Sequence, residues 1–305
     1  MPVDLGVTLV AAATPFADSG DLDTGALAGN VQHAIEAGVR GILICGSTAE
    51  TVYLDDGERA ASISAARVAI PSDRILLVGT GAESTRQTHV LTAAAADAGA
   101  DVVLVAPPAF YLPAMTFEVL RRHYNEIADA SPVPVAIYQV PPRFATVELP
   151  TGLIAELSDH PNIIGIKDSR GSLEAATELV EATTPGFQVM VGSGAIIHGA
   201  LKAGATGAIL GVANLAPAEG QAIYEAWRRG DNDEAASIQA RIAPLHNAVI
   251  GGIGIPGVKA GLDMIGLRGG APRPPLLPLD NEGRGRVRDA LEQAGIELAA
   301  AARGN

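Results

Sequence analysis

The chain has 305 residues, of which 48% are hydrophobic, and this is enough to bury one large core with an appendage. A formal net charge of -13 argues against binding to a phosphate backbone, and no apolar stretch approaches the roughly 20 residues needed to span a bilayer. We therefore expect neither nucleic acid nor a membrane as a partner.

Runs rich in Val, Ile and Leu, flanked by Gly or Pro, alternate with Ala-rich helical stretches along most of the chain. They predict strands over residues 7–13, 41–45, 74–79, 101–106, 133–138, 163–167, 188–191 and 207–210. Continuous apolar runs suit parallel strands that are buried on both faces and joined by crossover helices. Eight such units predict an α/β fold, a (β/α)8 TIM barrel. A doubly wound open sheet is the competing architecture, but no GxGxxG follows the first strand and eight near-regular units favour closure.

The strand pattern stops after residues 227–230, and the remaining sequence predicts helices broken near Pro256 and by the proline-rich stretch 272–278. We therefore expect a barrel domain over residues 1–229 and a C-terminal helical extension over residues 230–305. A moderately amphipathic helix is predicted from about residue 284 to residue 302, where it can pack on the barrel or on another subunit.

A barrel carries its reactive residues at the C-terminal ends of its strands. Strand two ends in residues 46–50, where the hydroxyls of Ser47 and Thr48 and nearby amides can hold a carboxylate, or can equally cap a turn. Strand four is followed by the aromatic pair Phe110 and Tyr111. Strand five ends in Tyr138, and the strand-seven and strand-eight ends are rich in glycine, in residues 192–194 and around residue 207.

Lys167, one of only three lysines, closes the sixth apolar run. Burial at the end of a strand disfavours the charged ammonium, so we expect a lowered pKa and a nucleophilic amine, as a Schiff-base lysine requires. An isolated lysine in this place would more often extend to water. Here, however, the phenol of Tyr138 lies within reach if strands five and six are neighbours, and an amine, a phenol and two hydroxyls converge on one rim.

With these residues in place, the sequence resembles the dihydrodipicolinate synthase and N-acetylneuraminate lyase family of pyruvate-dependent class I aldolases. The motifs that carry the resemblance are residues 14–16, 46–50, 138–141, 165–168 and 192–194. The resemblance implies that Lys167 forms an imine with pyruvate or another 2-oxo acid and that Tyr138 shuttles protons. It also implies that Ser47 and Thr48 bind the pyruvate carboxylate, and that the backbone around Ile209 lines the same site.

Two branches of the family compete. Residues 79–85, 131–134, 159–164 and 254–257 are most similar to 4-hydroxy-2-oxoglutarate aldolases, which release pyruvate and glyoxylate. Arg143 stands where the synthases, which use aspartate semialdehyde, carry an arginine for a carboxylate. Both branches suit an acceptor with a carboxylate, which a guanidinium binds with two hydrogen bonds. The alternative for Arg143 is an exposed loop residue without such a role.

Three positions depart from the family pattern. Ala49 replaces a usual glycine, which puts the path of the carboxylate-binding loop in question, and Gln139 replaces an asparagine of the synthases. Tyr111 is the candidate for a tyrosine that the synthases borrow from a neighbouring subunit to complete a relay with Thr48 and Tyr138. The resemblance therefore implies a homo-oligomer, a dimer at least and a tetramer by analogy.

Other readings remain open. The same imine can expel a hydroxyl, as in a sugar-acid dehydratase, and the barrel can instead be a non-covalent phosphometabolite-binding protein or a keto-acid sensor. The six histidines show no HxH or HExxH spacing, so we expect no metal and no other cofactor. Residues 1–19 lack the pattern of a signal peptide and Cys45 has no possible internal disulfide partner, so we expect a cytoplasmic protein.

Overall fold

The computed structural model describes residues 3–145 and 147–300. Eight parallel strands close into a barrel in chain order, each paired with its neighbours and β1 paired with β8. The strands are β1 (Thr8–Ala11), β2 (Gly41–Ile44), β3 (Ile75–Gly79), β4 (Val102–Val105), β5 (Val135–Gln139), β6 (Ile163–Asp168), β7 (Gln188–Val191) and β8 (Gly207–Leu210). The predicted TIM barrel is confirmed, and every predicted strand overlaps an observed one.

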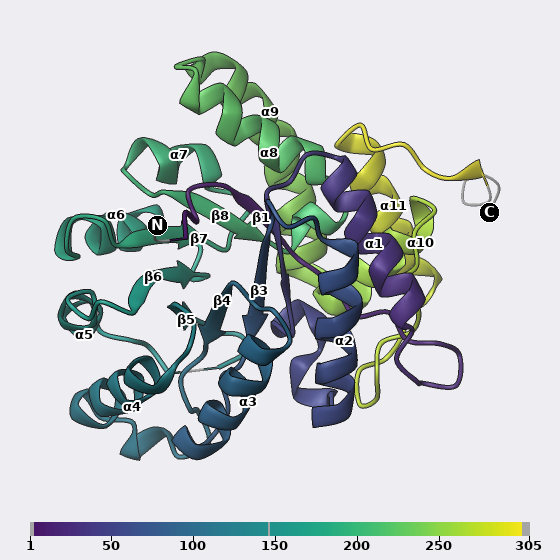
Figure 1. Cartoon of the computed structure of the whole chain (residues 1–305). Helices are drawn as coiled ribbons and strands as arrows, with labels where there is room; N and C mark the ends of the chain where they lie inside the picture. Colours follow the sequence, from purple (N-terminus) through teal and green to yellow (C-terminus); the bar gives the residue numbers. More distant parts are fainter. Residues whose placement is uncertain (1–2, 146, 301–305) are drawn as a thin grey trace.

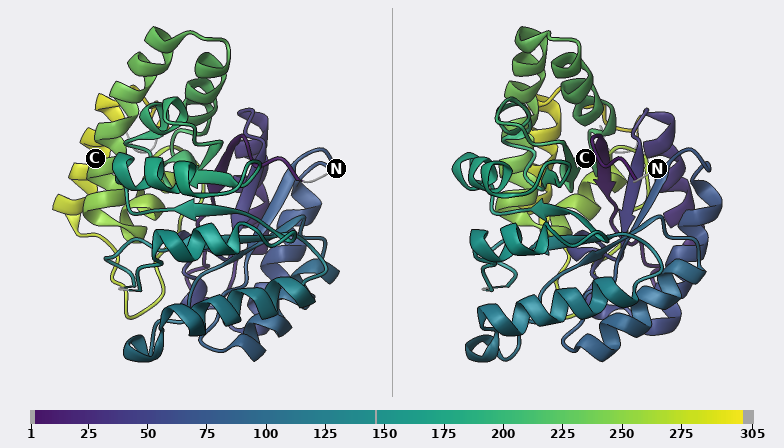
Figure 2. Two further views of the ribbon diagram at one scale, coloured as in Figure 1. Left: turned by 90° about the vertical axis from the view of Figure 1, so that its left-hand side faces the viewer. Right: turned by 60° about the vertical axis from the view of Figure 1, so that its left-hand side comes forward.

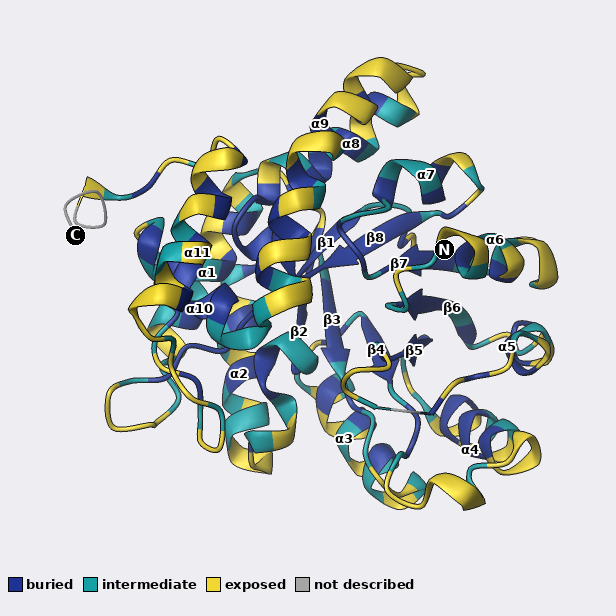
Figure 3. Cartoon of the chain, turned by 180° about the vertical axis from the view of Figure 1, so that it is seen from behind, coloured by how far each residue is buried: buried dark blue, intermediate teal, exposed yellow. Residues whose placement is uncertain are grey.

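One α-helix follows each strand and covers the outside of the barrel (Figure 1). These helices are α1 (Thr24–Glu36), α2 (Asp56–Ala69), α3 (Thr85–Asp97), α4 (Phe117–Ala130), α5 (Thr151–Leu157), α6 (Leu173–Ala182), α7 (Ile197–Lys202) and α8 (Pro217–Arg228). The strands are buried, whereas the helices are exposed on the faces that turn away from the barrel (Figure 3).

The period-two geometry of the strands divides their side chains between two cores. Leu43, Leu77, Tyr138 and Met190 belong to a cluster inside the barrel, while the alternate residues of the strands pack with the surrounding helices. In the register of the barrel, Tyr138 pairs with Lys167, and Lys167 pairs with Met190. Lys167 therefore stands in an inward-facing row.

The chain beyond α8 forms α9 (Asn232–Leu245), a π-helix (His246–Ile253), α10 (Ile255–Met264) and α11 (Asn281–Gln293). Helices α10 and α11 lie together on one side of the barrel (Figures 1 and 2). Helix α11 ends nine residues before the predicted limit at residue 302, which is outside the described residues together with residue 301. Among the residues described, no helix combines the length and the apolar character needed to cross a membrane.

Candidate active site

A cavity of about 350 Å³ opens at the C-terminal end of the barrel. Lys167 reaches it from the end of β6 and is 5% exposed. Burial lowers the pKa of its ammonium from the ordinary 10.5, and the neighbouring Tyr138 phenol opposes that effect only in part. Its Nζ lies 4.7 Å from the centre of the Tyr138 ring. Burial thus favours the neutral amine over the ammonium.

The phenol of Tyr138 connects the lysine with the loop that follows β2. Its Oη lies 3.4 Å from the Ser47 Oγ, within hydrogen-bond distance. Thr48 lines the same cavity next to Gly211, which follows β8. Amine, phenol and two hydroxyls therefore line one cavity, an arrangement that can transfer protons to and from a bound small molecule.

The loop after β2 does not need a glycine at residue 49. Its left-handed residues are Cys45, at φ 52°, and Glu50, at φ 55°, whereas Ala49 lies between them in a short 3-10 helix. Glycine is required nearby instead, because a Cβ on Gly79 would come within 2.1 Å of the Cys45 carbonyl oxygen. The departure at Ala49 is therefore compatible with a formed loop.

A buried ion pair links the C-terminal extension to this loop. Lys259 of α10 donates from Nζ to the Glu50 carboxylate at 2.6 Å, and both side chains are at most 1% exposed. The backbone amide of Arg273 donates to the other Glu50 oxygen at 2.7 Å. The Phe16 ring adds cation-π contacts, with the Lys259 Nζ and the Arg273 Cζ each 4.2 Å from its centre.

Arg143 lies on the loop between β5 and α5, at the mouth of the cavity. It donates from Nη1 to the Gly251 carbonyl at 2.6 Å and stacks at 4.7 Å on the Phe144 ring. The buried Gln139 amide ties both ends of this loop, because it donates to the carbonyls of Val140 and Val147 and accepts from the Leu149 amide. The departure at Gln139 thus serves to anchor the segment that carries Arg143.

Another part of the cavity lining comes from the π-helix, which no motif of the sequence connects with the site. His246 lies at its start and contacts Ser193, the second residue after β7, with its Nε2 3.2 Å from the Ser193 Oγ. Burial and then the positive charge of Arg143 lower the pKa of His246 from 6.5 to about 4, so the imidazole is neutral at pH 7. π-Helical segments often occur at functional sites, so the helix type itself points to this part of the cavity, although only the structure reveals it.

The described residues that line the cavity include no Asp or Glu, although the whole chain carries a net charge of -13. Two arginines and one lysine line it, namely Arg143, Arg170 and Lys167. Arg170 is neutralised by a two-fold hydrogen bond to Asp168, with both distances 3.0 Å. Arg143 has no ion-pair partner among the described residues, so its charge remains available to a substrate anion.

The predicted site residues divide into two groups. The structure brings Ser47, Thr48, Tyr138, Arg143 and Lys167 to one cavity. Ile209, by contrast, is fully buried inside the barrel, and Gly211 is the residue after β8 that reaches the cavity wall. The reason is the strand period, since the inward Ile209 lies two residues below the rim.

Tyr111 also lies away from the cavity wall. Its side chain is 70% exposed, and its ring meets that of Phe110 edge to face at 5.1 Å. Within one subunit it is not part of the site, so its expected part in a relay depends on a neighbouring copy of the chain.

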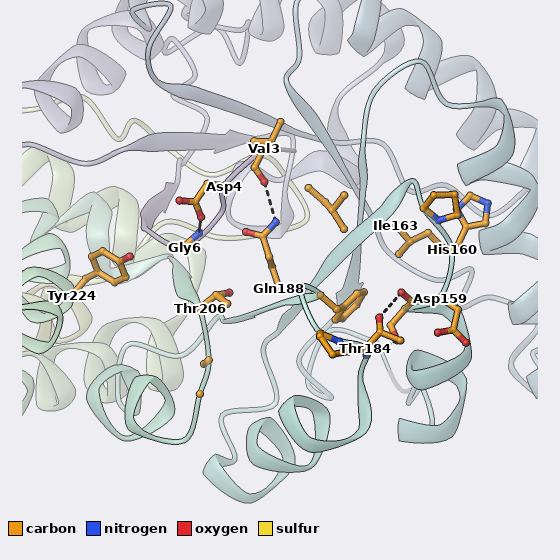
Figure 4. Close-up of a pocket in the computed structure, with 18 of the residues that line it drawn as sticks. Val3, Asp4, Gly6, Asp159, His160, Ile163, Thr184, Gln188, Thr206 and Tyr224 are labelled. Carbon is orange, nitrogen blue, oxygen red and sulfur yellow. Dashed lines mark hydrogen bonds between the residues drawn. The ribbon is translucent and has the colours of Figure 1, made fainter. Parts of the chain in front are cut away.

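A larger cavity, of about 730 Å³, opens at the N-terminal end of the barrel (Figure 4). There Gln188 donates to the Val3 carbonyl and accepts from the Leu5 amide, which fixes the N-terminal segment across the barrel. None of the described residues that line this cavity is a lysine. Size therefore does not identify the reactive site, because only the C-terminal cavity joins an amine to a phenol.

Comparisons of the sequence and of the fold with known proteins lead to the same family. The sequence matches the Dihydrodipicolinate synthetase family over residues 4–294. A protein of Emericella nidulans named "Probable 4-hydroxy-2-oxoglutarate aldolase, mitochondrial" is 37% identical over 93% of this chain and 92% of its own length. A 4-hydroxy-tetrahydrodipicolinate synthase of Synechococcus sp. is 33% identical over 95% of each chain.

Among solved structures, the fold is shared with a prophage protein of the dihydrodipicolinic acid synthase family from E. coli K12, in complex with pyruvate. It has a TM-score of 0.89 and 27% identity, over 96% of this chain and 100% of that one. The expected cytoplasmic location stays a prediction, since the name of the Emericella nidulans relative assigns that protein to mitochondria.

Proposed function

This chain belongs to the Dihydrodipicolinate synthetase family of aldolases and lyases, and we propose that it uses Lys167 as a Schiff-base nucleophile. The proposed reaction cleaves or forms the carbon-carbon bond between pyruvate and a small oxo acid such as glyoxylate. The observation that carries the proposal is the 5% exposed Lys167 amine, 4.7 Å from the Tyr138 ring, in a cavity whose described lining has cationic groups and no carboxylate.

The chemistry follows from these groups. Lys167 Nζ adds to the keto carbon, and the carbinolamine loses water to give a protonated imine. This imine draws electrons from the bond between the carbons α and β to the imine carbon. Tyr138 removes the proton from the hydroxyl of the departing half as that bond breaks, which leaves an aldehyde and an enamine. Protonation of the enamine and hydrolysis of the imine then release pyruvate and the free lysine.

Ser47 and Thr48 are proposed to hold the carboxylate next to the keto carbon. Their hydroxyls border the cavity beside Tyr138, and the ion pair between Glu50 and Lys259 fixes the loop that carries them. The similarity to the Emericella nidulans aldolase supports a 4-hydroxy-2-oxoglutarate substrate.

A second candidate is 4-hydroxy-tetrahydrodipicolinate synthase, which joins pyruvate to aspartate semialdehyde. It is favoured by Arg143 at the mouth of the cavity and by the similarity to the Synechococcus synthase. The purified protein should be assayed for pyruvate release from 4-hydroxy-2-oxoglutarate and, separately, for condensation of pyruvate with aspartate semialdehyde. We expect the first reaction to dominate in kcat/KM. Dominance of the second would assign the synthase, and turnover of neither substrate would reject both.

A further inference from the structure

The hydroxyl of Ser193 is surrounded by donors. The backbone amide of Gly194 donates to His246 Nδ1 at 3.2 Å, so this ring nitrogen is an acceptor and carries no proton. A neutral imidazole must then carry its proton on Nε2, which lies 3.2 Å from Ser193 Oγ. The Ala195 amide donates to the same oxygen at 3.3 Å. Ser193 Oγ thus accepts twice.

This arrangement fixes the direction in which the hydroxyl proton points. Ser193 lines the cavity and is 7% exposed, and among the described residues the two groups that hydrogen-bond to its hydroxyl, the His246 ring and the Ala195 amide, are both donors. Its own proton is left to donate to an acceptor inside the cavity. A buried hydroxyl without that acceptor loses a hydrogen bond that water gave it, which penalises any ligand lacking a suitable oxygen.

The place of Ser193 decides which part of a substrate it meets. Lys167 pairs in register with Met190, β7 ends at the next residue, Val191, and Ser193 is the second residue of the loop that follows. Ser193 therefore lies beyond the backbone of Lys167 toward the rim of the barrel, where we place the half of the substrate remote from the keto carbon. Arg143 borders the same cavity with its charge available.

We propose that Ser193 is a specificity-determining residue whose hydroxyl, oriented by His246, donates to the distal carboxylate of the substrate. The proposal rests on the proposed function and deepens it, because it selects substrates with a carboxylate at both ends. His246 acts as a positioning residue, since its Nε2 proton is directed at Ser193 Oγ.

The test uses 2-oxo acids that form an imine without needing turnover. Borohydride trapping on the full-length protein is followed by mass spectrometry for pyruvate, for 2-oxoglutarate, and for 2-oxopentanoate, in which a methyl group replaces the distal carboxylate. Wild-type protein is expected to reach half-maximal trapping at a lower concentration of 2-oxoglutarate than of 2-oxopentanoate. In Ser193→Ala that preference should shrink roughly tenfold or more, while trapping of pyruvate stays within about twofold.

Two further variants separate positioning from folding. Ser193→Thr keeps a hydroxyl and should recover most of the preference, whereas His246→Phe should lose it in the same direction as Ser193→Ala. An unchanged preference in Ser193→Ala, an equal shift for all three acids, or no preference in the wild type would overturn the inference. Absence of any pyruvate adduct on wild-type Lys167 would instead reject the proposed function.

Discussion

Two buried lysines in this chain show how the surroundings set the chemistry of one residue type. Burial lowers the pKa of both Lys167 and Lys259. Lys259, however, donates to the Glu50 carboxylate at 2.6 Å, which favours its charged form, while Lys167 faces the phenol of Tyr138 and no carboxylate among the residues that the structure describes. The first is suited to an ion pair and the second to nucleophilic attack.

The pH dependence of imine formation should reveal the lowered pKa of Lys167. The neutral amine is the reactive form, so the rate should rise as pH rises and the ammonium loses its proton. Because burial lowers this pKa, the rise should level off below pH 10.5. Initial rates of borohydride trapping with pyruvate, measured across pH, provide the check. A rate that keeps rising through pH 10.5 would show that the amine is not desolvated.

Tyr138→Phe should lower kcat for carbon-carbon cleavage by roughly 100-fold or more, since it removes the proton-transfer group. Its stability should change little, because the hydrogen bond between its hydroxyl and Ser47 is long, at 3.4 Å. Tyr124→Phe is the matched control, since the buried Tyr124 hydroxyl donates to the Val105 carbonyl in the helix-facing core. The control should affect urea unfolding more than kcat, and a Tyr138→Phe enzyme with normal kcat would exclude the proposed role.

At the residue level, sequence reasoning found the reactive groups but not all of their neighbours. Ser47, Tyr138 and Lys167 were predictable because strand ends meet at one rim of a barrel. His246 was not, because it follows the last strand by more than thirty residues and nothing local indicates where the extension packs. For Ile209 the strand position was right, but the cavity wall begins two residues later, at Gly211.

At the level of elements, the regular units were the predictable ones. Apolar runs bounded by Gly or Pro located all eight strands to within a few residues. The π-helix His246–Ile253 has no comparable periodic signal, and the proline inside α9, Pro244, precedes it closely. Proline removes an amide hydrogen and disturbs the helical ladder, which is consistent with a change of helix type just beyond it.

The ion pair between α10 and the loop after β2 should stabilise the whole site. Glu50→Gln leaves Lys259 as a buried cation without its charged partner, so we expect a loss of about 3–5 kcal/mol in the free energy of unfolding. Urea unfolding measures this loss. The control is Arg268→Ala, which breaks an exposed ion pair with Asp18 and should change stability little. Equal effects of the two changes would contradict a supporting role for Glu50.

At the scale of the whole molecule, charge and surface point to different tasks. The chain is strongly acidic, yet the described lining of the cavity has no carboxylate, so a small anion is attracted to one place on an otherwise repelling protein. Apolar side chains are exposed near the start of α4, where Phe110 is 78% and Tyr111 70% exposed. We propose that this surface meets a second copy of the chain.

Sedimentation velocity should therefore give a mass above that of the monomer. If Tyr111 completes a relay in a neighbouring subunit, Tyr111→Phe should keep the oligomer and lower kcat, because it retains the ring and removes only the hydroxyl. Phe110→Leu serves as the control for a general disturbance of this surface. A monomer with full activity would disprove the proposed contribution of Tyr111 to the site of a neighbouring subunit.

Peptide mapping after borohydride reduction in the presence of pyruvate identifies the lysine that forms the imine. The chain offers only three lysines, and they differ in surroundings: Lys167 is buried beside a phenol, Lys259 is buried in an ion pair, and Lys202 is exposed. We predict one adduct, on Lys167, and its loss in Lys167→Ala together with all turnover. An active enzyme without this adduct, or with the adduct on Lys259 or Lys202, would contradict imine formation at Lys167.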